Sequence, residues 1–317
     1  MTCCDCILKA TGGITLSLLA IFVSKIIYRI FYPFFIAKTL DLHALAGAKY
    51  AVITGSTDGI GKAYASQLAQ KGFNIVLISR TQSKLESVKK EIELIAPGTE
   101  VEVIAFDFTC ADFKEYQDKI FKKLRTLEVG ILINNVGDGT TRPEIIHNTE
   151  GGIQKSRDVN VINTLPMTIL SHEVLKQMVP RNKGIIINVG SLLGDGEMGG
   201  WCVYSSTKKY MSHFSGILHN EYAPLGITVQ YLITGLVATN LSKVTQTSYF
   251  APSPNNYVRS ALATIGHVRE TTGYFAHQFS FELFKLLPTF LLDFLLRIQM
   301  RKMKEEYLKE IEAKKQK

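Results

Sequence analysis

The chain has 317 residues, of which 46% are hydrophobic and 20% are charged, a composition typical of a folded protein with a sizeable core. The formal net charge is +8, but residues 1–40 hold four cations against one acid and residues 297–317 hold eight against four. The excess therefore lies beside the two most apolar segments, and no basic stripe with interleaved aromatics occurs between them. This distribution excludes a typical nucleic-acid-binding protein and favours an anionic membrane surface as the partner.

Residues 1–42 are predicted to form an N-terminal membrane anchor. The sequence after Lys9 is almost wholly apolar and is interrupted only by Lys25 and Arg29. The uncharged part is short for a full crossing, which needs about 20 residues, but cations four apart share a helix face and can snorkel. Crossing the bilayer and lying in its surface both remain open. The cations follow the apolar stretch, which disfavours a cleaved signal peptide and places this flank in the cytosol.

Five cysteines are spread in a way that indicates a reducing compartment. Cys110 and Cys202 stand alone, and Cys3, Cys4 and Cys6 crowd the N-terminus. No second pair completes a zinc site, so no metal is predicted. Lipidation of the N-terminal thiols is an open alternative to an unmodified tip.

Residues 43–277 are predicted to form one α/β domain. Runs rich in Val and Ile alternate with helical patterns such as residues 61–72 and 83–96. Near-continuous apolar strands joined by helices predict a doubly wound parallel sheet, with helices on both faces. The predicted strands are residues 50–55, 73–79, 100–107, 129–135, 184–190 and 226–233.

A glycine-rich turn follows the first predicted strand in "TGSTDGIG". Gly55, Gly59 and Gly61 allow the backbone to turn tightly and to approach a pyrophosphate, with a helix N-terminus behind it. The second strand ends at Arg80, where an acid would suit a free ribose hydroxyl. A guanidinium suits a 2′-phosphate instead, so NADP(H) is favoured over NAD(H). A surface role for Arg80 is the alternative.

Tyr204 and Lys208 are four residues apart in "YSSTK", so one helix face brings them together. Tyr210 and Lys209 do not share that face. Such pairs also arise by chance on helices, so the rest of the sequence decides whether this pair is functional.

The combination of "TGSTDGIG", "NNVG" (Asn134 to Gly137), Asn160, Ser191 and "YSSTK" resembles the short-chain dehydrogenase/reductase family over residues 48–277. "NNVG", "GYFAHQ" and the basic tail are similar to the branch of 17β-hydroxysteroid dehydrogenases and very-long-chain 3-oxoacyl-CoA reductases, and to nematode steroid dehydrogenase-like proteins. The resemblance implies a Rossmann-type fold and a catalytic domain that dimerises in many members, so a homodimer is possible.

The resemblance also implies a catalytic set. Tyr204 would donate a proton to the alkoxide formed at a ketone, and Lys208 would lower the pKa of its phenol. Ser191 would bind the substrate carbonyl, and Asn160 would hold a water that passes protons to Lys208. Turn chemistry at Ser191 and a helix bend at Asn160 are the structural alternatives.

The implied cofactor contacts extend along the carboxyl ends of the strands. One departure concerns Thr234, which stands where the family usually has proline and leaves the order of the following loop open. The implied contacts are Gly55, Ser56, Thr57, Asp58, Gly59, Ile60, Gly61, Arg80, Lys84, Asp107, Asn134, Gly137, Tyr204, Lys208, Val237 and Thr239.

The C-terminal part is predicted to cover the substrate and to return to the membrane. Residues 240–262 are expected to form a substrate loop, and residues 278–317 an apolar and basic membrane-associated segment. Lys314 and Lys315 resemble a dilysine retrieval signal of the endoplasmic reticulum, with a solvated charged tail as the alternative.

The sequence thus predicts an NADPH-dependent reductase in the endoplasmic reticulum membrane that faces the cytosol and reduces a ketone of a lipid-like substrate. A keto-steroid and a long-chain 3-oxoacyl-CoA remain alternatives, as does the direction of the reaction in cells. A non-catalytic NADPH-binding scaffold is the competing hypothesis.

Overall fold

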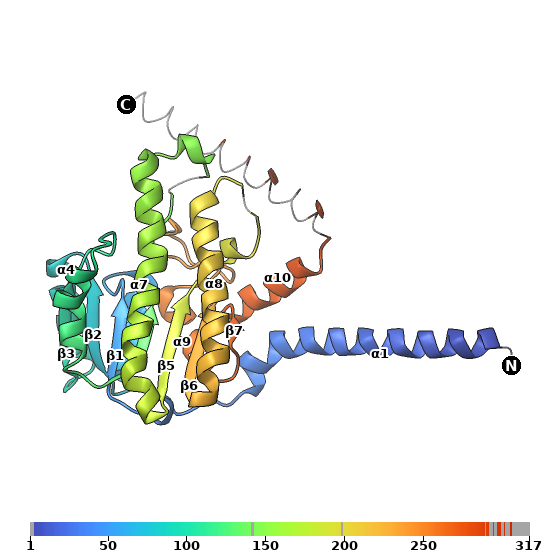
Figure 1. The fold of residues 1–317 in the computed structure, drawn as a ribbon, viewed down its shortest axis with the longest axis horizontal. Coiled ribbons are helices and arrows are strands. Elements are labelled where there is room, and N and C mark those ends of the chain that lie inside the picture. The colour runs from blue at the N-terminus through green and yellow to red at the C-terminus, as the bar shows by residue number, and fades with distance from the viewer. Residues whose placement is uncertain are drawn as a thin grey trace.

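A computed structural model describes residues 3–140, 143–197 and 199–288, together with residues 290, 291, 294, 297, 298, 301 and 305. Figure 1 shows a layered α/β domain from which one long helix, α1 (Cys3–Phe31), projects. The predicted doubly wound fold is confirmed. The seventh strand was not predicted, because two residues are too short to give a sequence pattern.

All seven strands are parallel, in the order β3-β2-β1-β4-β5-β6-β7. Since β1 pairs with both β2 and β4, the direction of winding reverses there, and the carboxyl ends of these strands flank a crevice in which such folds bind ligands. The strands are β1 (Tyr50–Thr54), β2 (Asn74–Ser79), β3 (Val101–Ala105), β4 (Val129–Asn134), β5 (Gly184–Val189), β6 (Ile227–Leu232) and β7 (Glu270–Thr271).

Helices cover both faces of the sheet, because side chains of each strand point alternately to the two sides. Ala51 and Ile53 face a core built with α3, α4 and α9, whereas Val52 faces a core built with the α5–α6 segment, α7 and α8. The helices are α2 (Leu42–Ala46), α3 (Gly59–Gln70), α4 (Gln82–Ile95), α5 (Phe113–Tyr116), η2 (Gln117–Phe121), α6 (Lys122–Leu124), α7 (Gly152–Arg181), α8 (Cys202–Tyr222), α9 (Pro254–Ala263) and α10 (Phe275–Lys285), with shorter turns at η1 (Tyr32–Ile36), η3 (Ile146–Asn148), η4 (Leu192–Gly194) and η5 (Ala223–Leu225).

The predicted substrate loop is only partly a loop. Residues 240–253 are irregular, but α9 follows and packs against α3. The hydroxyl of Ser253 caps α9 by accepting a hydrogen bond from the backbone N–H of Asn256, and Pro254 occupies the first turn, where its missing N–H costs nothing. The second half of the segment therefore belongs to the core, and the substrate loop of residues 240–262 stays a prediction.

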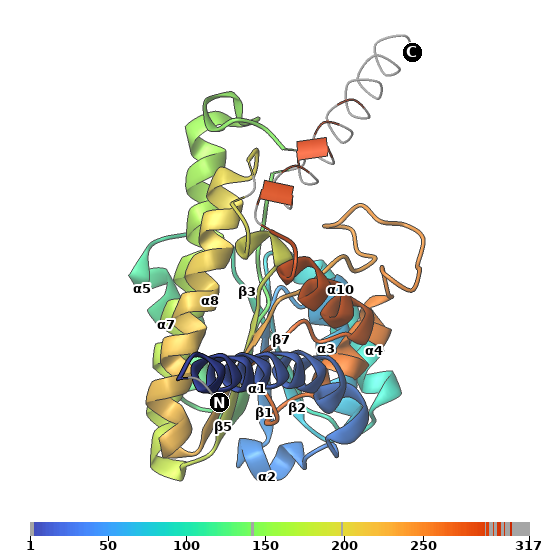
Figure 2. The same ribbon diagram turned by 90° about the vertical axis from the view of Figure 1, so that its right-hand side faces the viewer.

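The base of α1 packs against α10. Phe275 at the start of α10 contacts the rings of Phe31, Phe34 and Phe35. The guanidinium of Arg29, which was expected to snorkel, lies 3.9 Å from the carboxylate of Glu282, whose side chain is only 4% exposed. Figure 2 shows α1 and α10 on the same side of the domain.

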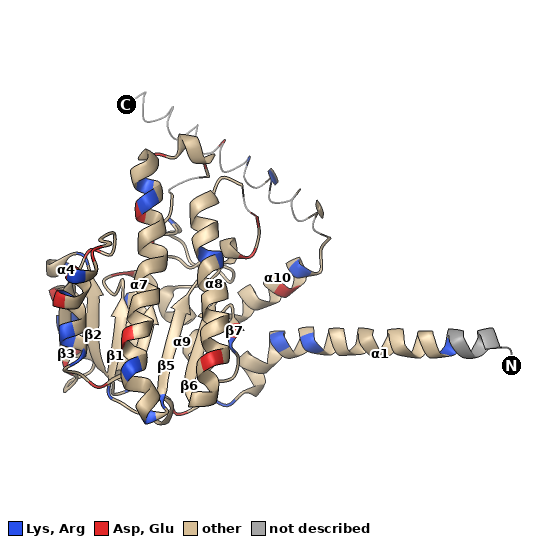
Figure 3. Cartoon of the chain, viewed as in Figure 1, with Lys and Arg blue, Asp and Glu red and all other residues tan. Residues whose placement is uncertain are grey.

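The segment Lys9–Ile36 is, among the described residues, the one that is long and apolar enough to cross a membrane, with a mean hydropathy of 1.9. Figure 3 shows its long uncharged stretch between cations at either end. Beyond α10, most of residues 289–317, including Lys314 and Lys315, fall outside the described part of the chain, as do the side chains of Cys3, Cys4 and Cys6.

Candidate active site

The turn between β1 and α3 has the shape of a phosphate cradle. Gly55 and Gly59 adopt φ values of +64° and +53°, which favour glycine. A Cβ atom on Gly61 would lie 2.3 Å from the backbone oxygen of Gly55, so any larger residue would push the turn apart. At these glycines no side chain blocks the approach to the backbone at the N-terminus of α3, and the turn fits a pyrophosphate group.

The polar residues of the same turn secure it to its neighbours. The hydroxyl of Ser56 is buried and lies 3.5 Å from the backbone oxygen of Ile78. The hydroxyl of Thr57 lies 3.0 Å from that of Ser79 on β2. The carboxylate of Asp58 accepts a hydrogen bond from the Asn240 amide at 2.7 Å, and Ile60 packs against the core.

Asn135 is a residue that the sequence analysis missed. Its amide donates to the backbone oxygens of Thr54 at 2.9 Å and Gly55 at 3.2 Å, so it ties the end of β4 to the glycine turn. Its neighbour Asn134 is buried and donates to Asn188 on β5 at 2.8 Å, which supports its predicted place within the sheet. In the sequence, the pair of asparagines directly after an apolar run could have identified both Asn134 and Asn135 as residues of the site.

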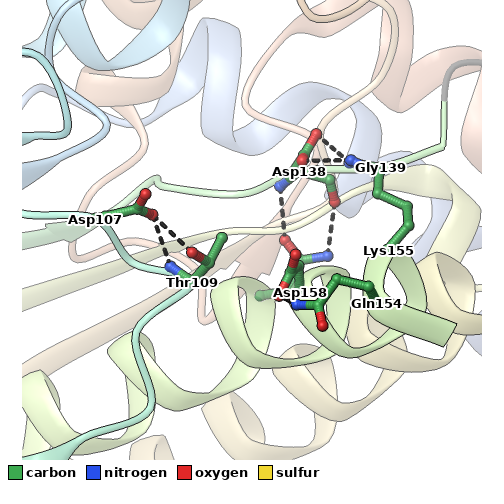
Figure 4. A network of polar contacts seen from close by, with 8 residues as sticks. Asp107, Thr109, Asp138, Gly139, Gln154, Lys155 and Asp158 are labelled. Atoms are coloured by element: carbon green, nitrogen blue, oxygen red, sulfur yellow. Dashed lines mark hydrogen bonds and ion pairs between the residues drawn. The ribbon is translucent and has the colours of Figure 1, made fainter. Parts of the chain in front are cut away.

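The predicted adenine-side residues lie at the ends of β2 and β3. Arg80 is exposed, and no described residue forms an ion pair with its guanidinium. Lys84 is exposed in the first turn of α4. The carboxylate of Asp107 accepts hydrogen bonds from the backbone N–H and the hydroxyl of Thr109, as Figure 4 shows.

Tyr204 and Lys208 lie one turn apart on α8, as predicted. The Nζ atom of Lys208 lies 5.6 Å from the centroid of the Tyr204 ring. This ammonium group is buried, donates to the backbone oxygen of Val189 at 3.2 Å and contacts the Met211 sulfur at 3.5 Å. Burial lowers the pKa of Lys208 to about 8.

Ser191 adjoins Tyr204 at the carboxyl end of β5. Burial raises the pKa of the Tyr204 phenol above its ordinary value, while the hydrogen bond from Ser191 opposes that rise. Burial therefore outweighs the hydrogen bond from Ser191, and the phenol pKa is raised on balance; the expected lowering by Lys208 stays a prediction.

The side chain of Asn160, predicted to act beside Lys208, is exposed on α7, and this role stays a prediction. Asn163, three residues later, is only 1% exposed. A Cβ atom on Gly137 would lie 2.9 Å from Asn163 Oδ1 and 3.4 Å from Lys208 Nζ, so both polar groups lie near Gly137. The helical spacing of the apolar residues could have identified Asn163 as buried. It lies on the same face of α7 as the buried residues Val159, Pro166, Met167 and Leu170.

The segment after β6 joins the two halves of the crevice. Val237 is buried, and Thr239 lies against the glycine turn, since a Cβ on Gly59 would come within 3.0 Å of its methyl group. The hydroxyl of Thr234 lies 2.9 Å from that of Tyr257 in α9. This side-chain contact connects the segment after β6 to α9.

The likeness to known proteins agrees with this geometry. The family model described as short chain dehydrogenase matches residues 49–249. A very-long-chain 3-oxoacyl-CoA reductase of Caenorhabditis elegans is 47% identical over 290 residues, covering 92% of each chain. A second protein of this nematode, whose name places it among the steroid dehydrogenases, is 47% identical over 269 residues, covering 85% of each chain. The solved structure of a Sphingobium yanoikuyae short-chain dehydrogenase in complex with NADPH has a TM-score of 0.62 and 27% identity, and the match covers 70% of this chain and 86% of that one.

Proposed function

Because this chain belongs to the short-chain dehydrogenase family and is an oxidoreductase of that type, we propose that it is a membrane-associated reductase that uses NADPH to reduce a ketone of a lipid-like substrate. The observation that carries the proposal is the convergence of Tyr204, Lys208, Ser191 and Asn163 at the carboxyl ends of β4 and β5. When bound, the cofactor supplies the hydride.

The four residues divide the remaining work. Ser191 and Tyr204 present two hydroxyls to the substrate carbonyl, and Tyr204 gives up its proton as negative charge develops on that oxygen. Burial keeps the phenol protonated at neutral pH, and Lys208 supplies the positive charge that stabilises the phenolate left behind. The proton path is assigned to Asn163 in place of Asn160, because the Asn163 amide and Lys208 Nζ both lie near Gly137.

The cofactor would lie across the crevice, with its pyrophosphate over Gly55, Gly59 and Gly61. Asp107 would lie near the adenine, and Gly137, Val237 and Thr239 near the nicotinamide. Arg80 would face the 2′-phosphate together with Lys84, and the exposure of both cations beyond β2 supports NADPH over NADH.

The substrate class follows from the relatives and from the cover of the site. Two of the curated relatives are named as a very-long-chain 3-oxoacyl-CoA reductase and as a steroid dehydrogenase. Residues 240–253 expose Leu241, Tyr249 and Phe250, which suits an apolar guest such as a long acyl chain or a steroid. Both substrates present one ketone beside a large apolar body.

The membrane association rests on the terminal segments. The exposed apolar surface of α1 and the outer residues Phe279, Leu283 and Phe284 of α10 would face lipid. The cations at the cytosolic end of α1, and the dilysine pattern, support an endoplasmic reticulum location with the domain in the cytosol.

The decisive experiment uses the purified full chain in detergent micelles. NADPH consumption is measured with a long-chain 3-oxoacyl-CoA and with keto-steroids side by side, for wild type, Tyr204→Phe and Tyr210→Phe. Tyr210 is the matched control, since its exposed side chain places the phenol oxygen 2.9 Å from the hydroxyl of Thr168 on α7. We expect Tyr204→Phe to lose activity by roughly 100-fold or more and Tyr210→Phe to keep it. Full activity in Tyr204→Phe, or none in wild type with either class despite NADPH binding, would favour a scaffold.

A further inference from the structure

A short backbone strip, Gly137–Asp138–Gly139, runs between the two halves of the catalytic set. On one side, Gly137 adjoins Asn163 and Lys208 as described above. On the other side, a Cβ atom on Gly139 would lie 3.1 Å from Cδ2 of the Tyr204 ring, so the bare backbone lies against this ring. Any displacement of the strip would move the ring and the buried amide together.

Asp138 fixes this strip in two directions. Its backbone N–H donates to Asn163 Oδ1 at 3.0 Å, and its backbone oxygen accepts from Asn163 Nδ2 at 2.9 Å. Its carboxylate accepts from the backbone N–H of Gly139 at 2.8 Å and from Lys155 Nζ at 2.6 Å. Figure 4 shows the carboxylate between Gly139 and Lys155.

Lys155 reaches this carboxylate from the first turn of α7. The Lys155 and Asp138 side chains are 28% and 39% exposed, so solvent screens the pair only in part. Lys155 contacts no group of the catalytic set in any hydrogen bond or ion pair of the described residues, and therefore acts through Asp138.

We propose that Asp138, held by Lys155, is a positioning residue that fixes the strip against the Tyr204 ring and places a negative charge beside the proton-donating phenol. This inference rests on the proposed reductase function and deepens it. Lys155 would offset the charge of Asp138, so that the pair adjusts how firmly the phenol holds its proton.

The direction of the effect follows from the charges that face Tyr204. The charge of Asp138 raises the pKa of the phenol, in the same direction as burial and against Ser191. Lys208, on the same helix, is the cation whose Nζ lies 5.6 Å from the centroid of this ring. Among the residues that the structure describes, the other titratable groups around this ring are Tyr231 on β6, Cys202 in the first turn of α8, and Glu144 beside the space that Tyr204 lines.

The test compares the pH dependence of kcat/KM for ketone reduction in three variants and one control variant. The basic limb is the fall in kcat/KM at high pH, where the phenol loses its proton. Asp138→Asn removes the negative charge and is expected to move this limb to lower pH by roughly 0.5 to 1 unit. Lys155→Met leaves the carboxylate without its cation and is expected to move the limb to higher pH by roughly the same amount. Lys155→Arg keeps the charge and is expected to restore the wild-type profile. Arg157→Met, which removes a cation from the same helix where it pairs with Asp158, is the matched control and is expected to leave the profile in place.

Opposite shifts distinguish an electrostatic effect from a purely structural one. If the two substitutions only made the strip more mobile, kcat/KM would fall in both Asp138→Asn and Lys155→Met, but their basic limbs would not shift in opposite directions. Shifts of the same sign, or none, would overturn the proposal. A second readout does not need turnover: NMR of ¹³Cζ-labelled tyrosine, with Tyr204→Phe identifying the resonance, should show the same opposite shifts of the phenol pKa. This separates failure of the inference from failure of the proposed reaction.

Discussion

The hydroxyl of Thr234 lies 2.9 Å from the phenol oxygen of Tyr257, and this buried contact connects the segment after β6 to α9. The Tyr257 hydroxyl also donates to the backbone oxygen of Thr272 at 3.1 Å, so one phenol ties together three parts of the chain. The backbone N–H of Thr234 donates to the Leu232 oxygen at 2.9 Å, a bond that proline could not make.

Replacing Thr234 with valine should therefore lower the free energy of unfolding by about 1 kcal/mol, the usual net value of one hydrogen bond. Urea denaturation of the full chain in detergent measures the change. Thr126→Val is the control, because Thr126 is exposed and bonds only a backbone oxygen three residues away. Equal stability of Thr234→Val and wild type would show that the contact does not stabilise the fold.

Gly61→Ala should damage the cofactor site, because its new Cβ would lie 2.3 Å from the Gly55 oxygen and force the glycine turn open. We expect NADPH affinity, measured by fluorescence titration, to fall by roughly 10-fold or more. Gly216→Ala is the matched control within α8, where nothing lies within 4 Å, and it should raise stability by about 0.5–1 kcal/mol. Unchanged affinity in Gly61→Ala would contradict the assignment of the cradle.

Arg80→Ala should weaken NADPH binding far more than NADH binding, because only NADPH carries the 2′-phosphate that a guanidinium recognises. Titration of both cofactors measures the ratio. Lys89→Ala removes a cation from α4 that pairs with Glu93 and should leave both affinities in place. Equal losses for the two cofactors in Arg80→Ala would defeat the assignment.

Asn163→Ala should lower kcat by roughly 10-fold or more, because it removes the amide beside Lys208, whereas Asn160→Ala should leave kcat unchanged. Asn163 also donates to Thr207 at 3.0 Å, so the unfolding transition of each variant is measured in parallel. An intact fold with reduced kcat supports the proton path. The opposite ranking of the two variants would restore the role first expected for Asn160.

Lys208 should make stability depend on pH above neutrality. Its folded pKa of about 8 lies below the ordinary value of 10.5, so the unfolded chain binds more protons between these values. Its contribution to stability therefore rises with pH in this window, by up to roughly 1.4 kcal/mol per unit. Urea titrations of wild type and Lys208→Met at pH 7, 8.5 and 10 measure the difference, which should favour wild type increasingly as pH rises. A pH-independent difference would contradict the lowered pKa.

Sequence patterns predicted the elements whose apolar or polar residues follow the regular spacing of a strand or a helix. The Val- and Ile-rich runs predicted β1 to β6 because a strand buried on both faces must be apolar throughout. The four-residue spacing predicted that Tyr204 and Lys208 share a helix face.

Features that depend on tertiary contacts were not predictable in the same way. Asn160 and Asn163 differ only in which face of α7 they occupy, and motif order alone did not separate them. The lowered pKa of Lys208 depends on burial, which the sequence does not show. Helix α9 was hidden because polar residues such as Asn255 and Asn256 begin it, although its buried side belongs to the core.

The joint between α1 and α10 constrains how the protein can stand on a bilayer. The contacts of Phe275 with three aromatic rings, and of Arg29 with Glu282, restrict the rotation of α1 relative to the domain. If α1 is embedded in lipid, the height and tilt of the catalytic crevice above the headgroups are set by this joint. An apolar substrate could then reach the crevice by lateral diffusion within one leaflet of the bilayer, without passing through water.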